Sequence, residues 1–402
     1  MKKLGLILAS ASLMATMFTG CNTQNPTAAS NDLAPTAILR NNVTLAELAP
    51  KNGTPIEGQY IVVFNENHVP RRSGKGFVSE KARKLLRERG MNDQSVEKVY
   101  DNALSGFCAK VSKAEMEKLK EDPSVLFIEQ DRIVTIEGGK KRDVTPPPEQ
   151  QITPWGISRV GGFVDATNLG RTAWIIDTGV DQDHPDLNVA ESNNISFVPR
   201  DSNPDDKHGH GTHVAGIIAA KNNSQDVVGV AAGAPVVSVR VLDRRGSGAM
   251  SDVLAGVNYV ASRAQVGDVA NMSLGGGVYD ALDLAVTNAG QAGIKFVLAA
   301  GNESMDASLT SPARANGENV FTVSAIDEAD ALAYFSNYGL GVDYAAPGVN
   351  ILSLQKGGGT TTMSGTSMAA PHVTGLLLLG PIVTDGFISG DKDNVADPIA
   401  HR

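Results

Sequence analysis

Cysteine is scarce in this chain of 402 residues, which has two, Cys21 and Cys108, and none beyond position 108. Residues 109–402 therefore cannot form a disulfide, and packing or bound ions must stabilise them. Positive charge is also limited. Lys and Arg total 35 against 44 Asp and Glu, which gives a net charge of −9. This acidic balance argues against nucleic acid as the main partner.

An apolar run of membrane-spanning length is missing from the N-terminal segment. The mostly apolar stretch 4–18 follows Lys2 and Lys3 and is short for a membrane span. It is typical of an export signal, which we place at 1–21. The small residues before Cys21 resemble the cleavage box of bacterial lipoproteins. Ordinary signal cleavage with an incidental cysteine is the alternative. We expect export from a bacterial cell, with a precursor that a lipid on Cys21 would anchor to the membrane.

Composition divides the rest of the chain into four parts. Residues 22–55 are rich in Asn, Thr, Ala and Pro and are predicted to be a flexible tether. Residues 56–136 form a small α/β unit. The Gly-, Lys- and Pro-rich segment 137–150 is an exposed linker and a suitable place for proteolytic cutting. Residues 151–402 form the main domain.

Both folded parts show alternating strand and helix patterns. In the small unit we predict the order strand, helix, strand, helix, strand, and Ser112 with Glu115 predicts a capping box. The main domain alternates throughout, with predicted strands at 172–176, 236–242, 269–273, 295–300 and 320–324, and predicted helices at 212–220, 252–263, 280–292 and 367–379. This alternation predicts an α/β fold, a doubly wound parallel sheet with helices on both faces. Active sites in such folds lie beyond the carboxyl ends of the strands.

Three motifs carry candidate chemistry. They are Ile-Ile-Asp-Thr-Gly around Asp177, His-Gly-His-Gly-Thr-His around His210, and Gly-Thr-Ser-Met-Ala around Ser367. The first also occurs in aspartic proteases, but those need a second copy, which this chain lacks. The second lacks the glutamate that a zinc peptidase needs between its histidines. Together, the three supply a buried acid, a base and a serine that the base can activate.

These motifs in this order resemble those of the subtilisin-like serine proteases, from about residue 151 to 380. The resemblance implies that Asp177 orients the base, His210 is the general base, and Ser367 is the nucleophile. It also implies that the Asn302 side chain and the Ser367 backbone N–H stabilise the oxyanion. All four catalytic positions are filled, which disfavours a non-catalytic binding protein of the same fold. His208, His213 and His372 are predicted to be structural.

The resemblance also implies a peptide-binding groove. One edge is the segment containing Ser273, Leu274 and Gly275, and the opposite wall contains Gly248. Both would pair with the backbone of an extended protein or peptide substrate. Backbone pairing makes few demands on sequence, so we expect an endopeptidase of broad specificity that acts as a monomer.

A structural calcium site follows from the same resemblance, and no catalytic cofactor is expected. The alternative is a simple surface turn. Oxygen ligands of the kind calcium prefers would come from side chains and carbonyls of the following residues: Gln151, Asp186, Lys221, Asn223, Gln225 and Val227.

The unit at 56–136 resembles the family's ferredoxin-like propeptide, an intramolecular inhibitor and folding chaperone. This implies a zymogen that processes itself within 137–150 and releases a soluble catalytic domain at 151–402. A structural lipoprotein, cut at the linker by another enzyme, is the rival interpretation. The acidic tail at 391–397 is expected to be solvated.

Overall fold

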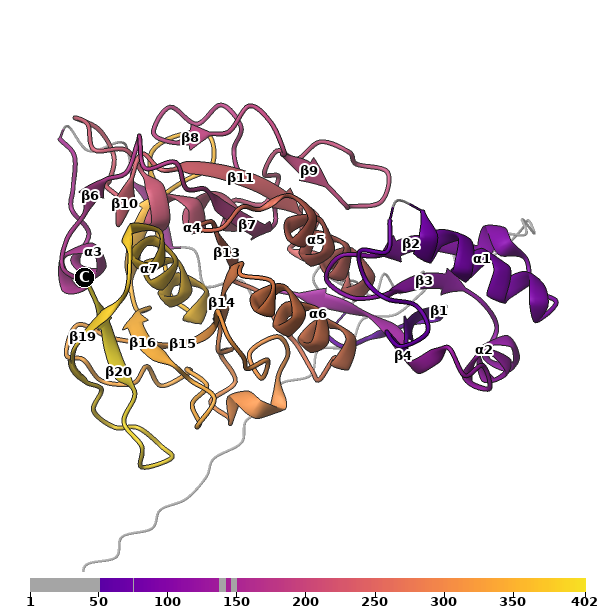
Figure 1. The fold of residues 1–402 in the computed structure, drawn as a ribbon. Coiled ribbons are helices and arrows are strands. Elements are labelled where there is room, and N and C mark those ends of the chain that lie inside the picture. The colour runs from indigo at the N-terminus through magenta and orange to yellow at the C-terminus, as the bar shows by residue number, and fades with distance from the viewer. Residues whose placement is uncertain (1–50, 75, 137–141, 146–149) are drawn as a thin grey trace, which may run out of the picture. The chain divides into compact units, whose positions relative to one another are not determined.

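The computed structural model describes residues 51–74, 76–136, 142–145 and 150–402 (Figure 1). The predicted export segment, Cys21 and most of the predicted tether lie outside these residues. No helix in the described ranges has both the length and the apolar character needed to cross a membrane.

The small unit is an antiparallel sheet with two helices. Its sheet has the order β4-β1-β3-β2. The elements are β1 (Pro55–Phe64), α1 (Phe77–Glu88), β2 (Val96–Tyr100), β3 (Gly106–Lys110), α2 (Lys113–Lys120) and β4 (Val125–Thr135). The capping box of Ser112 and Glu115 is confirmed. The predicted element order was wrong in one respect, because it omitted β2. This strand is a charged, mostly half-exposed edge strand, so its sequence lacks the apolar run that marks a buried strand.

The main domain is built on a ten-stranded sheet of order β19-β20-β16-β15-β14-β13-β7-β11-β8, with β9 pairing to β11 (Figure 1). Neighbouring strands run parallel from β8 at one edge of this sheet, through β11, β7, β13, β14 and β15, to β16. The central strands are β7 (Ala173–Asp177), β11 (Pro235–Arg240), β13 (Val269–Met272), β14 (Lys295–Ala299), β15 (Val320–Ile326) and β16 (Tyr344–Pro347). The predicted α/β class with a doubly wound parallel sheet is confirmed.

Alternate side chains of each central strand pack on opposite faces of the sheet. In β7, Ala173 and Ile175 join the apolar cluster formed with α4 and α7. Trp174 and Ile176 join the cluster formed with α5 and α6. A strand buried on both faces therefore reads as a continuous apolar run. The helices are α4 (His210–Ala219), α5 (Met250–Arg263), α6 (Asp280–Gln291) and α7 (Thr366–Leu379).

The small unit extends its sheet into the main domain. Strand β12 (Ser247–Ala249) pairs antiparallel with β4, and Gly248 lies opposite Val134. The Asn258 side-chain oxygen accepts three backbone N–H groups, from residues 101 to 103. Glu129 accepts the first N–H groups of α6.

Two segments that we predicted to be irregular contain paired residues. Gly53 and Thr54, in the predicted tether, form backbone hydrogen bonds with Ile133 of β4. Four residues of the predicted linker form β5 (Arg142–Thr145), which pairs with β18 (Thr360–Met363).

The expectation of a solvated tail holds for residues 391–396, which are exposed or half-buried, and was wrong for Asp397. Asp397 is buried and accepts a hydrogen bond of 2.8 Å from Ser324. It precedes β20 (Pro398–His401), which pairs with β16 and with β19 (Val383–Phe387). The buried Ile399 shows why composition misled us, because a few apolar residues after an acidic run are enough to place it against the sheet.

Candidate active site

Asp177 and His210 form a buried hydrogen-bonded pair. Asp177 is the last residue of β7, and His210 is the first of α4. The His210 Nδ1 atom lies 2.9 Å from each carboxylate oxygen of Asp177. A carboxylate can only accept, so Nδ1 carries the proton and Nε2 keeps a free lone pair. The glycine after His210 is required here, because a Cβ on Gly211 would collide with the backbone of Gly179.

The environment of His210 balances two opposing effects. Burial by itself lowers its pKa, because it disfavours the charged ring. The charge of Asp177 and its hydrogen bond outweigh burial, so the pKa of His210 lies above its ordinary value. The pair therefore favours a transient imidazolium, which is the state that a general base passes through.

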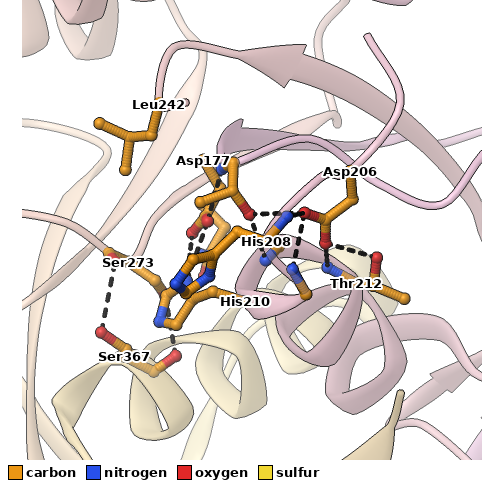
Figure 2. Close-up of polar contacts among 12 residues, drawn as sticks. Asp177, Asp206, His208, His210, Thr212, Leu242, Ser273 and Ser367 are labelled. Atoms are coloured by element: carbon orange, nitrogen blue, oxygen red, sulfur yellow. Dashed lines mark hydrogen bonds and ion pairs between the residues drawn. The ribbon is translucent and has the colours of Figure 1, made fainter. Parts of the chain in front are cut away.

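Ser367 lies in the first turn of α7, and this helix packs against α4. Its hydroxyl donates to the backbone oxygen of Ser273 at 3.2 Å, and the Ser273 hydroxyl donates to the backbone oxygen of Ser367 at 2.8 Å. Figure 2 shows both contacts, with His210 drawn close to Ser367. The structure thus joins Asp177 to His210, while the serine hydroxyl is bonded to the end of β13. Rotation about its Cα–Cβ bond would redirect it.

The Asn302 amide is oriented by α7. Its Oδ1 atom accepts from the Thr366 backbone N–H at 2.8 Å and from the Thr366 hydroxyl at 3.1 Å. With the oxygen fixed in this way, the amide NH₂ is left to donate. Sequence reasoning missed this role of Thr366, although its position directly before Ser367 was a usable signal.

A pocket opens beside Ser367. Ser273, Leu274 and Gly275 line it, as do Asn302 and the serine itself. The remaining lining residues come from the neighbouring loops and the small unit: Asn52, Thr135, Ile136, Gly276, Ala299, Ala300, Gly301, Glu303, Thr310, Ser311, Ala313 and Thr366. Gly248 lies in β12 and borders a different cavity, next to the small unit. Asn52, which donates to the Gly275 carbonyl at 3.3 Å, gave no signal in its Asn- and Thr-rich surroundings.

The loop after α4 brings most of the predicted metal ligands together. The Gln151 amide donates to the Lys221 carbonyl at 2.8 Å and lies 3.5 Å from both Asn223 Oδ1 and the Val227 carbonyl. Asn223 in turn donates to Asp186. Asp186 is fully buried, and its Oδ2 atom has no hydrogen-bond partner among the described residues. Burial raises the pKa of Asp186 to about 7.

Two further residues belong to this loop. The Gln225 backbone N–H donates to Asn223 Oδ1 at 2.8 Å, which fixes the turn. Asp226 is buried rather than facing solvent, and burial raises its pKa. A second carboxylate beside Asp186 increases the local negative charge. Among the described residues, however, no group of three or more His, Cys, Asp or Glu residues could hold a metal ion.

Two other histidines are buried and neutral. Burial lowers the pKa of His213 to about 3 and that of His372 to about 4. The ring of His213 contacts the Thr361 carbonyl at 3.1 Å, and the ring of His372 contacts the Met368 carbonyl at 2.9 Å. Their contacts are with the backbone, as expected of structural histidines.

Comparison with protein families identifies two domains. Residues 173–380 match the subtilase family, and residues 59–137 match the peptidase inhibitor I9 family. The first range contains Asp177, His210, Asn302 and Ser367, and the second covers nearly the whole small unit.

Individual proteins that resemble this chain support the same family assignment. The chain is 41% identical over 346 residues to alkaline serine exoprotease A of Vibrio alginolyticus, covering 83% of this chain and 62% of that one. It is 36% identical over 400 residues to the extracellular serine proteinase of Thermus sp. (strain Rt41A), covering 94% and 90%. A crystal structure of a cold adapted subtilisin-like serine proteinase matches with a TM-score of 0.51 at 42% identity, covering 57% and 84%. The chain therefore belongs to the subtilase family of serine endopeptidases and carries an I9 propeptide domain.

Proposed function

We propose that this enzyme cleaves internal peptide bonds through an acyl-enzyme formed on Ser367. The observation that carries the proposal is the bond of 2.9 Å from His210 Nδ1 to each oxygen of Asp177, at the start of a helix that packs against α7. It leaves Nε2 as the basic atom beside the helix that bears the serine.

The reaction proceeds in two halves. The Ser367 hydroxyl turns from the Ser273 carbonyl to His210 Nε2 and loses its proton there as Oγ attacks the peptide carbonyl carbon. Asp177 stabilises the resulting imidazolium. When the tetrahedral intermediate collapses, the C–N bond breaks and the amine leaves with the proton from His210. Water then attacks the acyl carbon and gives a proton to His210. The C–Oγ bond breaks, Ser367 Oγ takes that proton back, and the acid leaves.

The oxyanion is held by the Asn302 amide and the Ser367 backbone N–H. The bonds from Thr366 to Asn302 Oδ1 hold the amide in place before the reaction, so no reorganisation is needed as charge develops.

Asn302→Ala should therefore reduce kcat by about 10²–10³-fold, the loss produced by removing such an oxyanion donor in subtilisin, a member of this family. KM should change little, because the donor acts mainly on the transition state. Asn302→Asp is the matched variant: it keeps an oxygen for Thr366 but has no NH₂ group, and it should be equally impaired. Steady-state kinetics on a peptide anilide test this. Normal kcat in both variants would remove Asn302 from the mechanism.

Substrates are proposed to bind as extended strands between β12 and the segment 273–275. The pairing of β12 with β4 supports this, because β4 is itself an extended segment of the same chain. The Ile136 N–H donates to the Gly246 carbonyl at 2.9 Å, which continues the pairing toward the linker. Main-chain bonds of this kind suit many sequences, so we propose broad specificity.

The domain boundaries proposed from sequence fit a zymogen: export signal 1–21, tether 22–55, propeptide 56–136, linker 137–150 and catalytic domain 151–402. Cleavage within the linker would separate inhibitor from enzyme. The Thermus relative is named an extracellular proteinase, which supports export of this chain. A lipid on Cys21 would hold the precursor at the membrane, and the mature monomer would leave it.

A structural calcium ion is proposed for the loop after α4. The site fits a cation, because Asp186 is buried with an unpaired oxygen while carbonyl and amide oxygens surround the Gln151 amide. Asp186, Asn223, Gln151 and the carbonyls of Lys221, Gln225 and Val227 would hold it. A bound calcium supplies positive charge that pairs with the buried carboxylate and ties the N-terminal segment to this loop.

Chelation of calcium should lower the thermal unfolding midpoint of the mature enzyme. At a calcium concentration 100 times Kd, binding contributes about 2.7 kcal/mol, which is a shift of about 5–10 °C for a domain of this size. Asp186→Asn should no longer respond to chelator, whereas the surface variant Asp165→Asn should respond as wild type does. A wild-type midpoint that calcium does not move would contradict this site.

A further inference from the structure

A second carboxylate, Asp206, is buried directly before the helix that carries His210. Its side chain is 2% exposed. Its side chain forms no hydrogen bond with the His210 ring. The motifs that identified Asp177, His210 and Ser367 do not include it. Figure 2 shows it on the far side of His208 and His210 from Ser367, joined to several groups by dashed lines.

One carboxylate oxygen of Asp206 gathers donors from two loops. Oδ1 accepts from the hydroxyl of Thr178 at 3.0 Å, and from the backbone N–H groups of His208 and Gly209, both at 2.8 Å. Thr178 directly follows the catalytic acid, and the other two residues directly precede His210. Oδ1 therefore links the turn after β7 to the turn before α4.

The other oxygen holds the first turn of α4. Oδ2 accepts from the backbone N–H of Thr212 at 3.0 Å and from its hydroxyl at 2.7 Å. Thr178 extends the network to the residue after His210, because its hydroxyl accepts from the Gly211 N–H at 3.0 Å. Backbone atoms on both sides of His210 are thus fixed by one buried anion and the threonine bonded to it.

We propose that Asp206 is a positioning residue for the reaction. It holds the turn after Asp177 and the first turn of α4 at fixed positions relative to each other, so that His210 stays paired with Asp177. This inference rests on the proposed roles of Asp177 and His210. An asparagine could not replace Asp206, because Asp206 accepts in all five contacts and three of them come from backbone N–H groups, which can only donate. Its NH₂ group would face either the three donors at Oδ1 or the N–H of Thr212 at Oδ2.

The charge of Asp206 also acts on the base. Besides Asp177, it is the carboxylate whose charge favours the protonated ring of His210. His213 lies close enough that its own charge and that of His210 disfavour each other, and the His208 ring lies 6.4 Å from the His210 ring. Because burial keeps the His213 ring neutral, the charges that favour the protonated His210 ring are those of Asp177 and Asp206.

The test compares wild type, Asp206→Asn, Asp205→Asn and His210→Ala, each matured by immobilised wild-type enzyme that is then removed, at equal protein concentration measured by absorbance. We expect Asp206→Asn to lower kcat by about 10²-fold with KM little changed, as misplacement of reacting groups does. The acid limb of its pH–rate profile should move to lower pH, because one charge that stabilises the imidazolium is lost. Asp205→Asn, the same change one residue earlier, should match wild type in kcat and in profile.

Thr178→Val separates position from charge and covers the case in which Asp206→Asn fails to fold. It removes the hydroxyl between Asp206 and Gly211 while keeping the carboxylate and the side-chain shape. We expect a lower kcat with an unshifted acid limb.

Wild-type kcat in either Asp206→Asn or Thr178→Val would overturn the inference, as would a loss confined to KM. A different result would contradict the proposed function itself: His210→Ala would then keep its activity.

Discussion

Ser367→Ala will reduce kcat by about 10⁶-fold, the loss that removal of the nucleophile causes in subtilisin. The hydroxyl is the atom that forms the acyl-enzyme, and alanine at the start of α7 leaves the helix, the oxyanion donors and the pocket in place. Peptide binding should therefore persist. The variant precursor can be cleaved with immobilised wild-type enzyme, which is then removed, and the product assayed on a peptide anilide.

Ser364→Ala is the matched control for this change. Ser364 lies three residues earlier, where its hydroxyl accepts from the Asn350 backbone N–H at 2.8 Å. It should retain wild-type kcat. Substantial turnover by the Ser367 variant, above the trace left by the processing enzyme, would show that another group is the nucleophile.

Asp177→Asn should reduce kcat by about 10⁴-fold, as loss of the orienting carboxylate does in other serine proteases. An asparagine NH₂ group facing Nδ1 would favour the tautomer with the proton on Nε2, which cannot accept the serine proton. The oxyanion donors remain, so residual catalysis above the uncatalysed rate is expected.

The same variant has a predicted pH signature. In wild type the Asp177 charge holds the pKa of His210 above its ordinary value, while burial opposes this. Removing the charge leaves burial dominant, so the acid limb should move to lower pH. Measuring kcat/KM from acid to neutral pH gives the result. An acid limb that stays in place, or moves upward, would contradict the assigned pairing.

Much of the architecture could be predicted from sequence because the central strands are buried on both faces. Trp174, Ile175 and Ile176 all pack in apolar clusters, so the strand appears in the sequence as consecutive apolar residues. Asp177 directly follows them. Edge elements lack this signal. Strand β2 is charged and lies at a sheet edge, where it pairs with β3. Strand β20 has four residues and is held by pairing with β16 and β19.

The candidate site was predictable as a set of residue types and not as a set of contacts. The motifs name Asp177, His210 and Ser367, but the serine hydroxyl is bonded to the Ser273 carbonyl, which no motif predicts. The same holds for Asp206. Its neighbours in sequence are acidic and polar, which is typical of a solvated loop. Only the fold reveals that its carboxylate accepts from the turn after β7, the turn before α4 and the first turn of α4.

Precursor processing tests the central claim most directly. Purified wild-type precursor and Ser367→Ala precursor are incubated side by side, and the products are separated by size and sequenced at their new N-termini. We predict that wild type alone is cut within 137–150 and sheds a fragment of propeptide size, while the variant remains intact. Equal processing of both would contradict self-maturation through Ser367 and would mean that another protease matures this chain.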